Sequence, residues 1–340
     1  MNYVDIFDKA VYAYLKDARY KGVSQKTYSN YEKRLKYFRE FWLGSDHSSA
    51  PTADTIRAWR DSLSDRGLSA STVKQYLVEL KAFFEFASDE ELHDIPYFKK
   101  NPVSKKLFPR NTGEAKKPYD KILDNDDIKL LWRNKKGTQG KYWARNYAII
   151  TLLLDGKIRN AELLDMKLKD IDFEHKEVVI PKGKGNKYRV VTLSDISLSA
   201  IKLYLKSGLR PKKCSDDDFL FGTTAAHVFG EGCNIGKEPW HRGTSQWLSK
   251  LVENHVKNVT GKSGFRTHSM RHNGAVIDLN NGSSLERIQA ELGHASITTT
   301  EIYAGRLQPV RHAREMADVI AYRDECANKN IKALAVKQAK

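Results

Sequence analysis

Two basic residues in the middle of the chain are hard to explain by structure alone. Arg159 comes just after an apolar run, where burial is expected and an unpaired guanidinium would be costly. Lys184 lies in the turn KGKGN, whose glycines let backbone and side chain approach a ligand closely, although lysines in such turns are also common on ordinary surfaces. The chemistry to consider is therefore the binding of an anion.

The stretch THSMRHNGA places two more candidates at the start of a predicted helix. His268 and Arg271 are three residues apart, so they share a helix face near an N-terminus that favours anions. His272 lies four residues after His268, and such a pair can bind a metal ion. The zinc signature HExxH needs a glutamate where Ser269 stands, and no third ligand follows. Metal binding is therefore not favoured.

The stretch ELGHASITTTEIYAG contains His294 and, after a Ser/Thr-rich turn, Tyr303. The chain has 16 tyrosines, most of which are expected to be packing residues, so neither residue is decisive alone.

Taken together, the order Arg, Lys, His-x-x-Arg, Gly-His, Tyr resembles the tyrosine recombinase (phage integrase) family. The matching stretches are GKIRNAELL with Arg159 and Glu162, GKGNKYRVV with Lys184, HSMRH with His268 and Arg271, LGHAS with His294, and TTTEIYAG with Tyr303. The resemblance covers essentially the whole chain. One departure is small: family members usually have Gly-Leu-Arg or Gly-Met-Arg where this chain has Gly156-Lys157-Ile158-Arg159.

The resemblance implies that Tyr303 attacks a DNA phosphodiester and forms a 3′-phosphotyrosyl intermediate with a free 5′-hydroxyl. Arg159 and Arg271 would bind the nonbridging oxygens through their planar forks, a geometry that lysine does not offer. Convergent cations of this kind stabilise the negative charge that gathers in the transition state.

The remaining residues of the motif would handle protons. Lys184 would protonate the leaving 5′-oxygen, His268 would assist the nucleophile, and His294 would donate a hydrogen bond to the phosphate. Glu162 is expected to support Arg159. Because the covalent bond conserves the energy of the phosphodiester, we expect neither a metal ion nor ATP nor another cofactor.

The predicted fold is mainly α with a small β-hairpin, in two domains. Helical blocks within residues 4–89 predict a four-helix domain at 1–108, which resembles the core-binding domain of the family. The expected N-caps are Ser24, Thr52 and Ser69, and the expected helix stops are Gly22 and Gly67. Its expected core aromatics are Tyr28, Tyr31, Phe38, Phe41, Trp42, Phe83 and Phe84.

Residues 109–119 are predicted to form a basic linker, and residues 120–328 an α+β catalytic domain. Its predicted helices lie within 122–135, 142–158, 159–168, 195–207, 243–259, 268–281 and 284–294, and the strands VVI and RVVTL flank the turn with Lys184.

A C-terminal helix with apolar Met316, Val319 and Ile320 is expected either to dock on a neighbouring protomer or to cover its own domain. Residues 329–340 are predicted to be a basic tail, with the last ten disordered.

The bulk composition fits a polyanion as partner. There are 58 Lys and Arg against 42 Asp and Glu, which gives a formal charge of +16. Three widely spaced cysteines fit neither a disulfide framework nor a zinc knuckle. No stretch is apolar and long enough to cross a bilayer, and no secretory signal is evident. We expect a cytoplasmic, nucleoid-associated protein of a prokaryotic cell, with no membrane partner.

The leading hypothesis is a site-specific recombinase or integrase of a mobile element or chromosome. It would bring together two duplexes carrying specific recombination sites in a homo-tetramer and exchange strands through a Holliday junction, with accessory DNA-bending proteins as further partners. A monomeric type IB topoisomerase-like enzyme shares the chemistry. A non-catalytic DNA-binding relative is a third hypothesis, against which the complete residue set argues. A metal-dependent nuclease using His268 and His272 is a fourth, which chelators would identify by inhibiting it.

Overall fold

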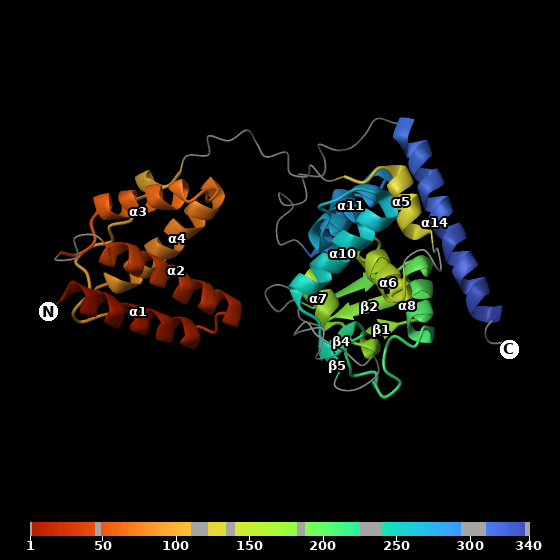
Figure 1. Ribbon diagram of the computed structural model, residues 1–340, viewed down its shortest axis with the longest axis horizontal. Coiled ribbons are helices and arrows are strands. Elements are labelled where there is room, and N and C mark those ends of the chain that lie inside the picture. Colours follow the sequence, from red (N-terminus) through yellow and green to blue (C-terminus); the bar gives the residue numbers. More distant parts are fainter. Residues whose placement is uncertain are drawn as a thin grey trace. The chain divides into compact units, whose positions relative to one another are not determined.

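The computed structural model is mostly helical and describes residues 2–44, 49–109, 122–133, 140–181, 188–224, 240–293 and 311–336, with residues 311–316 and 336 described by their backbone alone. The chain forms two compact units, Met1–Ala115 and Lys116–Lys340 (Figure 1). In the ranges just given, no helix combines the length and apolarity that crossing a membrane requires. The mainly α fold class with small sheets is confirmed.

The first unit contains four helices, α1 (Tyr3–Tyr20), α2 (Gln25–Leu43), α3 (Ala53–Asp65) and α4 (Ala70–Ala87), followed by the short 3-10 helix η1 (Lys105–Leu107). The side chains of Ser24, Thr52 and Ser69 accept hydrogen bonds from the first turns of α2, α3 and α4, so all three predicted N-caps are confirmed. Gly22 and Gly67 follow the ends of α1 and α3 with φ of +68° and +77°. Their left-handed backbone explains why glycine stands there.

Aromatic side chains fill the core of the first unit. Phe38 and Phe84 are completely buried, and their rings meet edge to face with centroids 6.0 Å apart. The other fully buried core aromatics are Phe7, Trp42, Trp59 and Phe83, with Tyr31 and Phe41 half-buried against them. The predicted aromatic core is confirmed for Tyr31, Phe38, Phe41, Trp42, Phe83 and Phe84. Tyr28 is equally half-buried but does not pack against this core; the Arg19 guanidinium lies 4.6 Å from its ring centroid.

The second unit combines helices with two small antiparallel sheets. Its helices are α5 (Asn125–Trp132), α6 (Trp143–Leu154), α7 (Asn160–Asp165), η2 (Leu168–Asp170), α8 (Asp195–Lys206), α10 (Ser245–Thr260), α11 (Thr267–Asn280), α12 (Leu285–Leu292) and α14 (Arg311–Val336). The strands β1 (Ile171–Asp172), β2 (Glu177–Ile180) and β3 (Arg189–Thr192) form one sheet, and β4 (Gly222–Thr224) pairs with β5 (Trp240–Arg242).

The predicted hairpin is confirmed as β2 and β3, with Val178 opposite Val191. Its turn at 182–187, and with it Lys184, lies outside the described residues.

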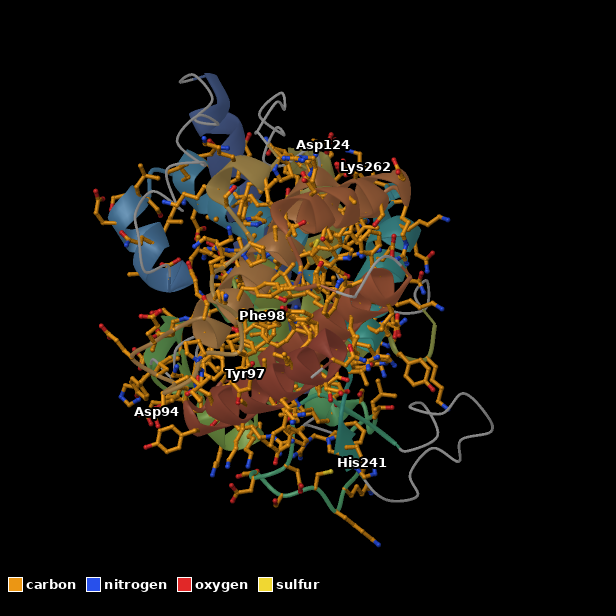
Figure 2. All side chains as sticks on the ribbon, turned by 90° about the vertical axis from the view of Figure 1, so that its left-hand side faces the viewer. Asp94, Tyr97, Phe98, Asp124, His241 and Lys262 are labelled. Carbon is orange, nitrogen blue, oxygen red and sulfur yellow. The ribbon has the colours of Figure 1, made fainter. Side chains whose placement is uncertain are left out.

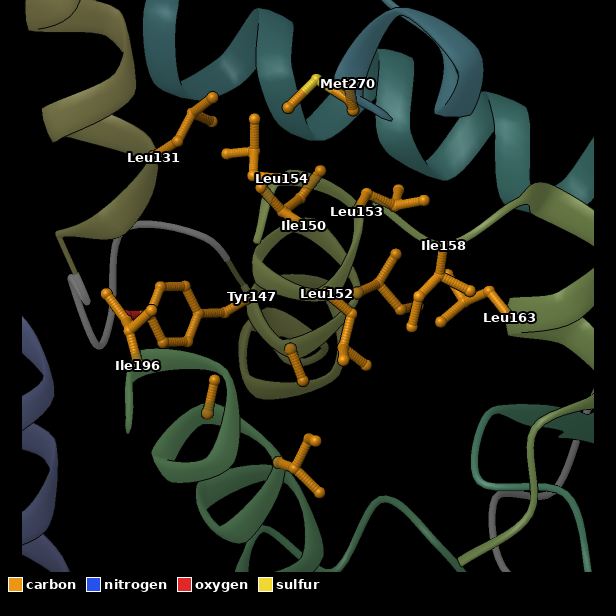
Figure 3. Packing of buried hydrophobic residues seen from close by; sticks show 14 of the residues in the cluster. Leu131, Tyr147, Ile150, Leu152, Leu153, Leu154, Ile158, Leu163, Ile196 and Met270 are labelled. Carbon is orange, nitrogen blue, oxygen red and sulfur yellow. The ribbon is translucent and has the colours of Figure 1, made fainter. Parts of the chain in front are cut away.

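Helix α6 is the centre of the second core and positions the turn that follows it. Every residue from Ala148 to Leu154 is buried, and the neighbouring elements surround the helix (Figure 3). Helix α11 packs directly against its end, because a Cβ at Gly274 would lie 1.9 Å from the Leu154 carbonyl oxygen. Lys262, which follows α10, pairs with Asp124 at the start of α5; the Nζ–Oδ2 distance is 2.6 Å (Figure 2).

The C-terminal helix α14 packs on its own domain, along α8 and α5 (Figure 1). Val319 is completely buried in the second core, and Ile320 packs partly buried against it, whereas the side chain of Met316 lies outside the described residues. The Asn330 amide donates to the Tyr147 hydroxyl at 3.2 Å. Val319 is therefore not available to dock on a neighbouring protomer in this arrangement.

The predicted disorder of the last ten residues is wrong for 331–336. There α14 continues through Val336, and Leu334 is buried at its end.

Candidate active site

Arg159 is the residue directly before α7; its side chain is partly buried, 25% exposed, and it has the partner that the sequence led us to expect. Its backbone N–H and its Nη1 donate to the two carboxylate oxygens of Glu162, each at 2.8 Å. Its Nη2 donates to the carbonyl oxygens of Leu292 and Gly293, both at 2.7 Å. The guanidinium is therefore held from two sides, by the first turn of α7 and by the end of α12.

Arg271 comes from α11 and is only 3% exposed. Its guanidinium donates to the carbonyl oxygens of Lys157 and Leu292. Arg159 and Arg271 therefore share one acceptor, the Leu292 carbonyl. The C-terminal end of a helix carries partial negative charge, which lets α12 hold two guanidiniums close together.

Gly293 allows this close approach. It ends α12 with φ of +58°, and a Cβ there would lie 3.3 Å from an Arg159 guanidinium nitrogen. Residues 294–310, which include His294 and Tyr303, lie outside the described residues and begin at this point of the chain. Gly293, the last described residue before this segment, thus contacts Arg159 directly.

Arg189 is a site residue that sequence reasoning missed. At the start of β3, it donates through Nη1 and Nη2 to the two carboxylate oxygens of Glu162, at 2.6 and 2.7 Å. The strand alternation contains a usable signal: Arg189 shares a face with buried Val191, and a guanidinium on a buried face needs a partner. Through Glu162, Arg189 connects the hairpin of Lys184 to Arg159.

Glu162 is buried but remains ionised. Burial alone would raise its pKa, but the hydrogen bonds from Arg189 and Arg159 outweigh burial and lower the pKa to about 2. Because two guanidiniums, those of Arg159 and Arg189, bond to this one carboxylate, the three side chains together keep a net positive charge.

His268 and His272 bond to each other. Their Nε2 atoms are 2.7 Å apart, which requires one imidazole to donate and the other to accept. Burial, together with nearby Arg271 and Arg159, lowers the pKa of His268, which favours its neutral form. Within the described part of the chain, no three His, Cys, Asp or Glu side chains gather as ligands of a metal ion would.

The same region draws two helix N-termini together. The Asn160 amide donates to Thr267 at the start of α11 at 3.1 Å and accepts from Ser245 at the start of α10 at 2.8 Å. Backbone N–H groups at helix N-termini favour anions. Beside the arginines they make this face suited to a phosphate.

Of the seven predicted site residues, the structure brings together Arg159, Glu162 and Arg271 around the end of α12, and His268 lies in the first turn of α11, where burial and both arginines lower its pKa. Lys184, His294 and Tyr303 lie outside the described residues. The roles assigned to all seven remain predictions.

Known proteins share both units of this chain. The model of the phage integrase family matches residues 121–308, and that of the phage integrase N-terminal SAM-like domain matches residues 11–91. The tyrosine recombinase XerD of Halalkalibacterium halodurans is 27% identical over 288 residues, covering 83% of this chain and 88% of that protein. The tyrosine recombinase XerC of Corynebacterium glutamicum is 29% identical over 282 residues, covering 83% and 82%.

Two solved structures share the fold. The XerH site-specific recombinase bound to a palindromic difH substrate superposes with a TM-score of 0.64 at 23% identity, covering 88% of this chain and 82% of that one. The Tn1549 transposon integrase in complex with a circular intermediate DNA gives 0.63 at 19% identity, covering 89% and 95%. Because the family model spans more than half of the chain, the protein belongs to the phage integrase family of tyrosine recombinases.

Proposed function

We propose that the protein is a site-specific DNA recombinase that cleaves and rejoins DNA strands through a 3′-phosphotyrosyl intermediate. The observation that carries this proposal is the convergence of Arg159 and Arg271 on the Leu292 carbonyl, directly before the segment that contains His294 and Tyr303. Two guanidinium forks at one point suit the nonbridging oxygens of a single phosphate.

In the cleavage step the Tyr303 oxygen forms a bond to phosphorus while the bond from phosphorus to the 5′-oxygen breaks. The phenolic proton leaves with help from His268, whose lowered pKa favours the neutral imidazole that can accept it. Lys184 gives a proton to the departing 5′-oxygen, and His294 donates a hydrogen bond to the phosphate. Attack by a second 5′-hydroxyl reverses these changes and joins the new strand without ATP.

The excess positive charge around Glu162 stabilises the transition state, which is more negative than the phosphodiester. Glu162 orients Arg159, and Arg189 orients Glu162. This arrangement holds the guanidiniums in place before DNA arrives, so little reorganisation is needed when charge develops on the phosphate.

The assembly that follows from this function is a homo-tetramer on two duplexes with specific sites, exchanging strands through a Holliday junction with or without accessory DNA-bending proteins. The domain assignment belongs to the same proposal: 1–108 binds DNA, 109–119 links and 120–328 catalyses, with α14 continuing from that domain through Val336. A prokaryotic, nucleoid-associated setting on a chromosome or mobile element fits this activity.

The test mixes the protein with a library of nicked duplexes in EDTA and looks for DNA that stays attached after denaturation. We expect adduct with the wild type and none with Tyr303→Phe, which keeps DNA binding because it loses only the hydroxyl. Adduct in the variant would reject Tyr303 as nucleophile. Adduct that depends on added metal would reject the metal-free mechanism.

Lys184 is tested on the DNA that the library yields. Lys184→Ala should slow cleavage of ordinary DNA. The cleavage rate of this variant should recover on a substrate with a bridging 5′-sulfur, because a thiolate leaves without protonation. Slow cleavage on both substrates would assign the acid to another residue.

A further inference from the structure

Lys157, two residues before Arg159, has a backbone that is unusual for its residue type. Its φ is +49°, in the left-handed region, where the Cβ of an L-residue crowds the following carbonyl. Among the described non-glycine residues, only Lys176 shares this feature, with φ of +58°. A lysine that keeps such a conformation needs a compensating interaction.

The compensation comes from the buried side chain. Its Nζ lies 2.5 Å from an Asp278 carboxylate oxygen, 2.9 Å from one of Glu291, and 2.8 Å from the Asp155 carbonyl oxygen, while only 5% of the side chain is exposed. The ammonium donates a hydrogen bond to the Asp155 carbonyl, and the two carboxylates lie beside it as ion-pair partners. Burial alone would lower the pKa of Lys157, but the two carboxylates raise it, so the group stays charged.

These contacts reach the same elements that hold the two arginines. Asp278 lies on α11, the helix of Arg271, and Glu291 directly precedes Leu292, whose carbonyl accepts from both arginines. The Lys157 carbonyl itself accepts from Arg271. One residue therefore ties together the turn before α7, α11 and the last turn of α12.

We propose that Lys157 is a positioning residue for strand cleavage. It fixes the end of α12 against α11, so that the carbonyls of Leu292 and Gly293 hold the guanidiniums of Arg159 and Arg271 in place. The inference rests on the function proposed above. Lys157 touches no reacting atom, so it acts only through the arginines. Its loss would free the end of α12 and leave Glu291 and the buried Asp278 without their shared cation.

The first experiment separates cleavage from binding. On the substrate recovered from the nicked-duplex library, single-turnover adduct formation should be about ten- to hundredfold slower in Lys157→Met, the usual range for residues that orient a site indirectly. The Kd for DNA should stay within about twofold, because affinity comes from many phosphate contacts. A wild-type rate, or rate and affinity falling in parallel, would overturn the proposal.

Lys176→Met is the matched control. Lys176 has the same left-handed backbone and an ion pair, with Asp195 at 2.8 Å, but its side chain is 49% exposed and it lies in the turn before β2. We expect its cleavage rate and DNA affinity to match the wild type. A loss equal to that of Lys157→Met would mean that the left-handed lysine backbone, and not the contacts of Lys157, matters.

Two further variants divide the effect. Lys157→Gly relieves the backbone and removes the ammonium, so it should gain thermal stability over Lys157→Met and still cleave slowly; a wild-type rate would show that the ammonium is not needed. Glu291→Gln weakens the link from Lys157 to α12, together with the exposed pair of Glu291 with Arg287 on the same helix, and should slow cleavage less than Lys157→Met. If Lys157→Met does not fold, Glu291→Gln still tests the proposal. A wild-type cleavage rate in Glu291→Gln would show that the ion pair between Lys157 and α12 is not needed.

Hydrogen exchange gives a readout that needs no catalysis. In DNA-free protein, amides of residues 285–293 should exchange faster in Lys157→Met than in the wild type or in Lys176→Met. Unchanged exchange there would overturn the role of Lys157, whether or not the wild type forms an adduct. Absence of adduct in the wild type would by itself reject only the proposed function. Adduct formed equally by wild type and Lys157→Met would reject only the role of Lys157.

Discussion

The two units of the chain treat charge in opposite ways. In the first unit, every buried residue among those described is apolar or aromatic. Its ion pairs range from Arg34 with Glu79, whose side chains are 15% and 14% exposed, to the solvated pair of Arg39 with Asp8. In the second unit, Lys157, Glu162 and Arg271 are buried together around the end of α12. The first unit is built for packing, whereas the second spends stability to orient charge.

This difference points to where chemistry takes place. Buried charges rarely improve stability over apolar residues of similar size, because desolvation offsets their attraction. They persist where orientation matters. Glu162 has two guanidiniums, Lys157 has two carboxylates and Arg271 has two carbonyls, so each of these three charges is fixed by at least two partners.

The largest effect is expected from Arg271→Lys, which keeps the charge and removes the fork. A lysine cannot reach both carbonyls and two phosphate oxygens at once, so single-turnover adduct formation should fall by about a thousandfold. DNA affinity, measured by anisotropy, should hardly change. A rate within about tenfold of the wild type would show that charge alone is sufficient.

Phe38→Ala should affect only the first unit. Removing a completely buried ring should lower the free energy of unfolding of that unit by about 3–5 kcal/mol. Calorimetry should show one transition at lower temperature and the transition of the second unit unmoved. Tyr12→Ala, at a residue that is 73% exposed, is the matched control and should leave both transitions in place.

Glu162→Gln sharpens the comparison through pH. The pKa of Glu162 is about 2 in the fold, below its unfolded value, so the ionised carboxylate stabilises the native state above about pH 5 and this contribution disappears as pH falls towards 2. The variant should lose on the order of 3 kcal/mol at pH 7 in urea unfolding. The gap from the wild type should close as the solution is acidified; a constant gap would contradict the depressed pKa.

The smallest effect is expected at the surface of the first unit. Asp8→Asn removes the carboxylate that binds Arg39 at 2.6 and 2.7 Å, but both side chains are solvated. Its free energy of unfolding should change by less than about 1 kcal/mol, and less again at high salt. A larger change would remove the distinction between solvated and buried charge on which the comparison rests.

Local signals made much of the fold predictable. Ser24, Thr52 and Ser69 could be assigned as N-caps because capping depends on residues within one turn. The hairpin followed from strand alternation around a glycine-rich turn. Arg159 was expected to need a partner, because the apolar run before it made burial foreseeable.

The partners themselves could not be predicted. Arg159 bonds to Leu292 across 133 residues of sequence, and Arg271 bonds to Lys157 across 114, so no local pattern contains either contact. The left-handed backbone of Lys157 could not be predicted, because the two carboxylates that hold its side chain come from α11 and α12. The sequence indicated an apolar face on α14, but such a face does not show whether the helix covers its own domain or a neighbouring protomer.

The most direct test of the account is to identify the residue that carries DNA in the trapped adduct. After digestion with nuclease and protease, mass spectrometry should find a nucleotide attached through its 3′-phosphate to the peptide that contains Tyr303. Attachment at any other residue, or through a 5′-phosphate, would contradict the mechanism built on the two converging arginines.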